Sequence, residues 1–290
     1  KHMGCESVVL RCTNDDILEQ YPALIRAAEA PVIDTASAAV LKLSQLIREH
    51  GFKVALTGQG ADELLAGYVW FKTSSMMERL NIVPGLTNGL RRLYTRFVTP
   101  NYPWKDIIGH MQSLGGRYNA AFDAFGRVFT PRFDFYSAEM KDRIVDYSSF
   151  AEMGLNRDRM SQWAPLNQGL YLTSRTLLSG MLLSSKGDRA CMNASVEMRH
   201  PFLDEDLFDF CAKLHPRWKL RGLRDKFLLR TVADKWLPKQ MSRRRKAMFL
   251  TPWESLCPNG SAGPTYVEEL LSEESLRRAG YFNPANVAKW

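Results

Sequence analysis

One stretch of the sequence decides the fold: Val54-Ala55-Leu56-Thr57-Gly58-Gln59-Gly60-Ala61-Asp62-Glu63. Its apolar start is typical of a short buried strand, and the glycines that follow let the backbone approach a ligand closely. If a helix begins near Ala61, its free N–H groups and positive dipole end would favour an anion. Asp62 and Glu63 then stand where a hard cation bridging phosphates would find oxygen ligands. A tight turn in which both carboxylates merely cap the helix explains the same spacing, so both interpretations stay open.

The segments before this stretch indicate a parallel α/β unit. Ser7-Val8-Val9-Leu10 has the composition of a strand. A helix is expected to begin at Asn14 or Asp15, which are good N-cap residues, and a second to run from Thr35 to a stop at Gly51. Strand, helix and strand in this order favour a parallel pair joined by a crossover helix.

Helical patterns dominate from about residue 70 onward. The expected helices cover residues 76–82, 104–114, 118–128, 166–183, 206–214, 226–236 and 267–279. The aromatic residues of 117–136 are interpreted as core packing. We therefore predict an α/β fold in which residues 1–70 form a truncated parallel-sheet layer and residues 71–290 a mainly helical part of the same domain.

The bulk composition is that of a globular protein outside the membrane. The 290 residues are 45% hydrophobic and 24% charged, with a net charge of +8. No apolar run approaches the roughly 20 residues that a membrane span needs, and no signal-peptide core follows Lys1. The five cysteines form no CxxC pair and no zinc-like cluster with histidine, which favours reduced thiols in the cytoplasm. The positive charge suits an anionic ligand.

A second informative stretch runs from Lys186 to Asp204 and packs charges among small and apolar residues. Buried charges are costly unless they are paired or contact a ligand. A structural ion-pair network is the interpretation favoured for Glu197, Arg199 and Asp204. Lys186 and Arg189 are interpreted as cations that face a ligand.

A third stretch, Ser242-Arg243-Arg244-Arg245-Lys246-Ala247-Met248-Phe249, is strongly basic. Such a run is usually a solvated surface. The sequence does not favour nucleic-acid binding, because aromatic residues are sparse around the run and no nucleic-acid motif accompanies it. The five histidines are scattered, and each is interpreted as an ordinary surface or core residue.

Taken in order, these stretches resemble the C-terminal synthetase domain of the glutamine-hydrolysing asparagine synthetases. The matching residues are Glu29-Ala-Pro31 with Asp34, Leu56 to Glu63 with Gly67-Tyr68, Lys186-x-Asp188-Arg189, Glu197-x-Arg199-x-Pro201-Phe202-Leu203-Asp204, Lys226-x-x-Leu229-Arg230, Leu237-Pro238, and Arg244-x-Lys246-x-x-Phe249. Gly280-Tyr281-Phe282 also fits the end of that domain. Their order and spacing agree with the family along nearly the whole chain.

The resemblance implies an N-type ATP-pyrophosphatase layer of the adenine nucleotide alpha hydrolase-like kind. It also implies that ATP adenylates a carboxylate, most simply the side chain of aspartate, and that ammonia then attacks the acyl-adenylate. Asp62 would bind Mg²⁺, and Thr57 with the Gly58-Gln59-Gly60 loop would lie against ATP or the intermediate. Arg189 would stabilise the adenylation transition state, and Lys186 and Lys246 would contact phosphates.

The sequence also departs from the family. Many members have Glu where Gln59 stands, which places any acid–base role of this residue in doubt. The family's Ser-Gly-Gly-x-Asp-Ser phosphate loop and its glutaminase domain, the source of ammonia, would lie upstream of Lys1. Relatives that close β-lactam rings or cyclise peptides, and a non-catalytic scaffold without the phosphate loop, are the alternatives. A homodimer is possible.

Overall fold

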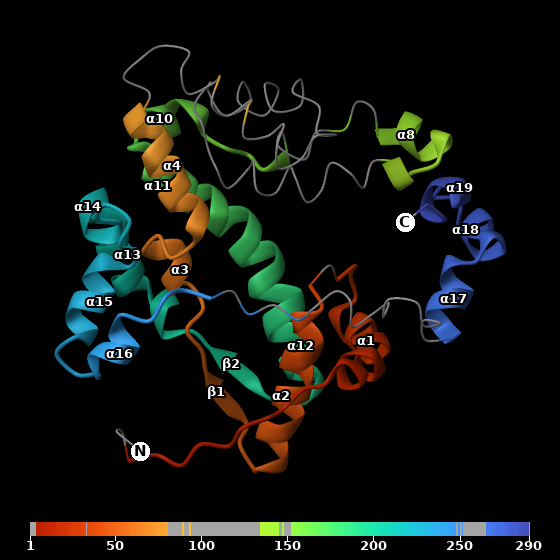
Figure 1. Ribbon diagram of the computed structural model, residues 1–290, viewed down its shortest axis with the longest axis horizontal. Coiled ribbons are helices and arrows are strands. Elements are labelled where there is room, and N and C mark those ends of the chain that lie inside the picture. Colours follow the sequence, from red (N-terminus) through yellow and green to blue (C-terminus); the bar gives the residue numbers. More distant parts are fainter. Residues whose placement is uncertain are drawn as a thin grey trace. The chain divides into compact units, whose positions relative to one another are not determined.

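The computed structural model (Figure 1) describes a large part of the chain as two compact units. The described residues are 4–32, 34–80, 89, 93, 134–144, 147, 152–247, 249, 251 and 265–289. The first unit comprises Lys1–Gly60, Thr176–Asp204 and Ala247–Val267, and the second comprises Ala61–Arg175, Glu205–Lys246 and Glu268–Trp290. Within the described residues, no helix is both long and apolar enough to span a bilayer.

The first unit contains helices around a small parallel sheet. Its elements are α1 (Asn14–Ala28), α2 (Ala36–Glu49), β1 (Val54–Leu56), the π-helix η3 (Ser184–Asp188), α12 (Arg189–Asn193), β2 (Glu197–Arg199) and the 3₁₀ turn η4 (Pro201–Leu203). The predicted helices near 14–25 and 35–51 are thus confirmed, with Gly51 just beyond α2 at a φ of +82°.

The N-cap of α1 lies one residue earlier than expected, because Thr13 and not Asn14 or Asp15 occupies that position. The Thr13 hydroxyl accepts from the Asp16 N–H at 3.2 Å, and the Asp16 carboxylate accepts from the Thr13 N–H at 2.7 Å. This reciprocal capping box satisfies two backbone donors at once. At α2, Thr35 occupies the N-cap position but its side chain does not cap; Asp34 accepts from the Ala36 N–H at 3.0 Å instead.

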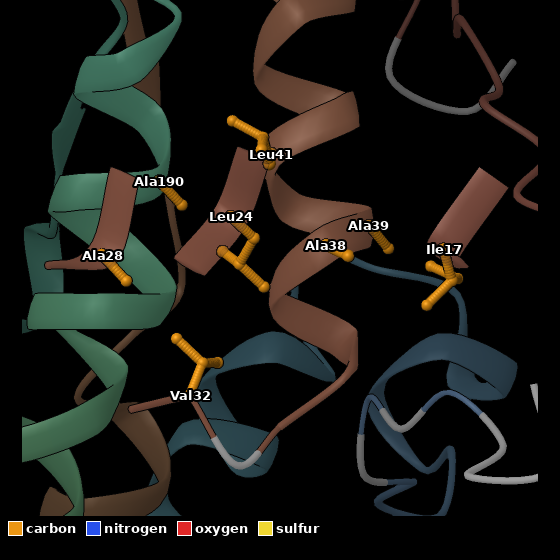
Figure 2. Close-up of a cluster of buried hydrophobic side chains, with 8 residues drawn as sticks. All are labelled: Ile17, Leu24, Ala28, Val32, Ala38, Ala39, Leu41 and Ala190. Carbon is orange, nitrogen blue, oxygen red and sulfur yellow. The ribbon is translucent and has the colours of Figure 1, made fainter. Parts of the chain in front are cut away.

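The core of the first unit lies between α1, α2 and α12. Figure 2 shows its buried side chains. They are Ile17, Leu24, Ala28, Val32, Ala38, Ala39, Leu41 and Ala190. Leu24 and Leu41 are fully buried, and burying one such side chain contributes about 1.5–3 kcal/mol. Because the alanine side chains are small, the helices can approach one another closely and pack without voids.

The sheet of the described residues consists of β1 and β2, which lie side by side and parallel (Figure 1). Leu56 pairs with Arg199 and Val54 with Glu197. The strand expected at residues 7–10 is wrong: these residues have no regular structure, and Val8 and Val9 are exposed. The strand that pairs in parallel with β1 is therefore β2 and not residues 7–10. β2 was not predicted as a strand, because the residues at both of its ends, Glu197 and Arg199, are charged.

The second unit is mainly helical, as predicted for the later part of the chain. It contains α3 (Ala61–Leu64), α4 (Val69–Leu80), α8 (Ala138–Ile144), α10 (Arg157–Ser161), α11 (Pro165–Thr173), α13 (Glu205–Lys213), α14 (Pro216–Lys219), α15 (Phe227–Ala233), α16 (Lys239–Ser242), α18 (Glu273–Ala279) and α19 (Pro284–Val287). Two further elements, the π-helix η2 (Ser174–Leu182) and α17 (Thr265–Leu271), include residues of both units.

Most of the predicted helical segments are confirmed with shifted ends. The segment 166–183 is helical, but α11 continues into the wider π-helix η2. The predicted helices at 104–114 and 118–128, and the aromatic residues of 117–133, lie outside the described residues. The protein is therefore an α/β structure with a two-stranded parallel sheet and many helices, and the division at residue 70 stays a prediction.

Candidate functional site

In the second unit, the carboxylate of Asp62 lies between two lysines that are far away in the sequence. Lys246 donates from Nζ to Asp62 Oδ2 at 2.9 Å. Lys226 Nζ lies 2.9 Å from Oδ1, but without the angles of a hydrogen bond, so this contact is Coulombic. The three side chains are 14–29% exposed. Two ammonium groups thus face the same carboxylate.

The backbone around Asp62 is shaped to allow this approach. A Cβ at Gly67 would collide with Asp62 Oδ1 and with Lys226 Cε, and would lie 2.7 Å from Asp62 Cγ. Lys226 itself has a φ of +47° and donates its N–H to the carbonyl of Leu65 at 3.0 Å. A left-handed lysine costs roughly 1–3 kcal/mol and persists where the surroundings impose it. Gly67 and Lys226 therefore hold a defined geometry at Asp62.

Next to Asp62, the buried Glu63 carries a hydrogen bond from Tyr68. The Tyr68 hydroxyl donates to Glu63 Oε1 at 2.5 Å, and Glu63 is 1% exposed. Burial raises the pKa of Glu63, against the opposing effect of this hydrogen bond. Burial and the neighbouring Glu63 charge raise the pKa of Tyr68. Lys246 Nζ lies 5.7 Å from the centre of the Tyr68 ring, within the range of a cation–π contact.

The residues at Asp62 do not fit a bound Mg²⁺ in this arrangement. Mg²⁺ is usually held by one or two carboxylates with water and substrate phosphates. Both oxygens of Asp62 face ammonium groups; Oε1 of the buried Glu63 accepts from Tyr68, whereas its Oε2 has no hydrogen-bond partner in the described part of the chain. Across the described residues, no group of three or more acidic, histidine or cysteine side chains could hold a metal ion. The two ammonium groups at Asp62 repel a further cation.

In the first unit, the glycine loop begins where β1 ends. Thr57 donates its backbone N–H to the carbonyl of Arg199 at 2.9 Å, and its Oγ1 lies 2.6 Å from Nδ1 of His200. Gly58 has open space around it, whereas Gly60 has a φ of +91° and packs against Leu203. The loop is thus fixed at both ends and open in its middle.

Lys186 is buried in the first unit and ion-paired. Its Nζ lies 2.5 Å from Asp34 Oδ2 and 5.4 Å from the centre of the Phe249 ring. The π-helix η3 places it there: the Asp188 N–H donates to Leu183 O, five residues earlier, at 2.8 Å, and π-helical turns are frequent at functional sites.

Arg189 begins α12, and its guanidinium donates to the carbonyl oxygen of Ala28. Of the predicted network of Glu197, Arg199 and Asp204, the ion pair between Arg199 and Glu197 is present at 2.8 Å, on exposed side chains; the part of Asp204 in it stays a prediction.

Each unit thus collects some of the predicted site residues. Asp62 and Lys246 are in direct contact in the second unit. The first unit contains the loop of Thr57, Gly58, Gln59 and Gly60. Lys186 and Arg189 belong to the same unit. Their roles toward a substrate stay predictions. Sequence reasoning missed two residues, Lys226 and His200. For Lys226 a signal existed, since it opens the motif Lys226-x-x-Leu229-Arg230; His200 stood out by no local pattern.

Comparison with known proteins identifies the family of the chain. The family model described as "Asparagine synthase" matches residues 1–290. The chain belongs to the asparagine synthase family. This confirms the resemblance on which the sequence interpretation rests, and it accounts for the order of the motifs from Glu29 to Phe249.

The relatives within the asparagine synthase family are distant. The chain is 26% identical to "Asparagine synthetase [glutamine-hydrolyzing] 1" of Bacillus subtilis over 86% of its own length and 38% of the relative's. It is 21% identical to "Amidase chyE" of Penicillium rubens, over 96% of the chain and 44% of that protein. A "Putative asparagine synthetase [glutamine-hydrolyzing]" of Mycobacterium bovis is 22% identical over 86% of the chain. The chain therefore spans less than half the length of these relatives. No solved structure matches it.

Proposed function

We propose that the full-length protein forms an amide from a carboxylate and ammonia at the expense of ATP. The observation that carries this proposal is the position of Asp62 between Lys226 and Lys246, directly after the glycine loop of an asparagine synthase family chain. Negative charge develops on the phosphates as pyrophosphate leaves, and fixed ammonium groups stabilise such charge most strongly where little water competes.

The proposed reaction has two steps. An oxygen of the carboxylate attacks the α-phosphorus of ATP, the bond to the bridging oxygen breaks, and pyrophosphate leaves with the electron pair. Ammonia then attacks the acyl carbon of the resulting acyl-adenylate, AMP leaves, and the nitrogen loses a proton. A free carboxylate is a poor acyl donor, so the adenylate supplies the leaving group that amide formation needs.

Candidate groups for this reaction lie in both units. In the second unit, Lys246 and Lys226 would bind phosphate oxygens, and Asp62 would hold their ammonium groups in place. In the first unit, Thr57 and the loop Gly58 to Gly60 would bind the nucleotide, and Arg189 and Lys186 would stabilise the adenylation step. The role of Asp62 as an Mg²⁺ ligand finds no support in its present neighbours, so no step is assigned to the metal.

Aspartate is the proposed acyl substrate, and glutamine the source of ammonia. The names of the Bacillus and Mycobacterium relatives support this choice. A different carboxylate is the second candidate, because two fungal relatives that match 96% of the chain are named amidases.

Product analysis tests the proposal. The full-length protein is incubated with ATP, aspartate and ¹⁵N-ammonium, and the products are identified by mass spectrometry. We expect ¹⁵N-asparagine, AMP and pyrophosphate in equal amounts. ADP and inorganic phosphate in their place would contradict adenylation. AMP formation that requires a carboxylate other than aspartate would support the second candidate.

A further inference from the structure

Two side chains meet at the carboxyl edge of the sheet in the first unit. β1 ends at Leu56 and β2 at Arg199, and these two residues pair in the parallel register. The next residue of each strand is Thr57 and His200, and Thr57 Oγ1 lies 2.6 Å from His200 Nδ1. Ligands of open α/β sheets bind outside the carboxyl ends of the strands. The contact between Thr57 and His200 therefore lies where a ligand of this sheet is expected.

The segment His200–Leu203 holds the glycine loop at both of its ends. At the start of the loop, His200 contacts the Thr57 hydroxyl. At its end, Leu203 of the turn η4 packs so closely on Gly60 that a Cβ there would lie 3.0 Å from Leu203 Cγ and 3.5 Å from Phe202 Cβ. Between these two points, Gly58 is exposed with open space around it. The middle of the loop is thus accessible while its ends are fixed.

The hydrogen bond between Thr57 and His200 can run in either direction, because a hydroxyl both donates and accepts and a neutral imidazole has one nitrogen of each kind. If Nδ1 accepts, the Thr57 proton is consumed by His200. If Nδ1–H donates, the Thr57 proton is free for a ligand. Phosphate oxygens accept hydrogen bonds and have no proton to give near neutral pH. A nucleotide in the loop therefore requires the second arrangement.

We propose that His200 is a positioning residue that donates its Nδ1–H to Thr57, so that the Thr57 hydroxyl donates to an oxygen of the nucleotide. This inference rests on the proposed function, since it takes the loop as an ATP site. It assigns to His200 a task that no motif indicated: His200 acts through Thr57 and need not touch the nucleotide.

The charges around His200 set the expected pH dependence. Burial lowers the pKa of His200, and Asp188 at the end of η3 opposes this effect. On its own strand, Glu197 and Arg199 are paired with each other. The imidazole is therefore mainly neutral at pH 7. Protonation below that pH forces Nδ1–H to donate and adds a positive charge, so affinity for the nucleotide rises as the pH falls through the His200 pKa.

The test measures ATP binding to the full-length protein by calorimetry, for His200→Ala, His200→Asn, Thr57→Val, Thr57→Ser and the double variant Thr57→Val/His200→Ala. Asparagine can donate from a position close to Nδ1 but does not titrate. We expect His200→Ala and Thr57→Val each to weaken binding about five- to tenfold, as for a lost hydrogen bond to a charged group. Thr57→Ser and His200→Asn should stay within about twofold of wild type, with the double variant no weaker than Thr57→Val alone.

Two outcomes would overturn the inference while leaving the proposed function intact. In the first, wild type binds ATP and the His200→Ala variant binds ATP with the same affinity. The other is a double variant whose loss equals the product of the two single losses, because His200 would then act independently of Thr57. The pH profile separates positioning from a structural role: we expect wild type to gain affinity relative to His200→Asn as the pH falls from 7.5 through the His200 pKa, which lies below the ordinary value of 6.5. A wild type that binds no ATP would overturn the proposed function itself.

Discussion

Lys246 donates to the carboxylate of Asp62 across 184 positions of sequence, at 2.9 Å. Lys226 approaches the other oxygen of the same carboxylate. The carboxylate thus brings together two cations that would otherwise repel each other. Two ammonium groups held at one place are suited to contact an anionic group such as a phosphate.

Gly67→Ala should impair activity far more than folding. The added Cβ would collide with Asp62 Oδ1 and Lys226 Cε, which are ends of side chains that can move aside. The cost is therefore loss of geometry, and a displacement of about 1 Å in a catalytic group can lower the rate about 100-fold. The measurement is kcat/KM for amide formation beside the thermal unfolding midpoint.

Gly180→Ala is the matched control for Gly67→Ala. Gly180 lies in η2 with open space around it, so a methyl group there should leave activity unchanged. A Gly67→Ala variant as active as wild type would show that the spacing of Asp62 and Lys226 does not matter for the reaction.

Asp225→Asn should destabilise the second unit strongly. Asp225 is 3% exposed and binds Lys72 and Arg230. Burial pushes the pKa of Asp225 up, but the hydrogen bonds from Lys72 and Arg230 outweigh it, and the pKa is lowered. Removing one partner of a buried ion cluster costs about 3–5 kcal/mol.

Urea unfolding measures the loss in Asp225→Asn. The exposed pair of Lys213 and Asp209 provides the control, and Asp209→Asn should change the free energy of unfolding by less than about 0.5 kcal/mol. Equal effects of the two substitutions would refute the importance of the buried cluster.

Lys186→Met and Asp34→Asn should each destabilise the first unit, while the combination should recover stability. The two side chains are 9% and 14% exposed and lie 2.5 Å apart. Breaking a buried pair costs about 3–5 kcal/mol, whereas removing both charges is often neutral. Because Lys186 is also proposed to stabilise adenylation, the double variant should be stable but impaired in AMP formation. Full activity of a stable double variant would reduce Lys186 to a structural role.

Asp16→Asn should remove part of the acid sensitivity of the protein. Its hydrogen bonds with Lys42 and Thr13 lower the pKa of Asp16 from 3.8 to about 2. The folded-state pKa is below the unfolded one, so the stabilisation is complete above about pH 4 and is lost as the pH falls toward 2. The free energies of unfolding of wild type and Asp16→Asn should therefore differ by a constant amount from pH 5 to 7 and converge below pH 4. A constant difference down to pH 2 would contradict the pKa shift.

The sequence predicted those parts of the fold that local patterns determine. The apolar face of α2 followed by Gly51 was sufficient to predict this helix, and the apolar run followed by glycines was sufficient to predict β1. The prediction of a strand at 7–10 was wrong: Val8 and Val9 have strand propensity, but among the described residues no strand pairs with them. β2 was missed for the opposite reason: Glu197 and Arg199 mark a surface ion pair, while the strand depends on β1, some 140 residues earlier.

The candidate site was predictable where its residues share one motif. Asp62 and the loop Gly58 to Gly60 follow directly from the strand–loop–helix pattern. The convergence of Lys226 and Lys246 on Asp62 is a long-range contact that no periodicity encodes. His200 was unremarkable in sequence, because its importance depends on the register that places it beside Thr57.

The central claim is that the Asp62 cluster serves adenylation of a carboxylate by ATP. Aspartate-dependent exchange of radiolabelled pyrophosphate into ATP, measured on the full-length wild type and on Asp62→Ala and Lys246→Ala, tests this claim most directly. The account predicts exchange in wild type that requires aspartate or another carboxylate, and a loss of about 100-fold or more in both variants. Exchange that persists undiminished in Asp62→Ala and Lys246→Ala, or that is absent from wild type with every carboxylate tried, would contradict it.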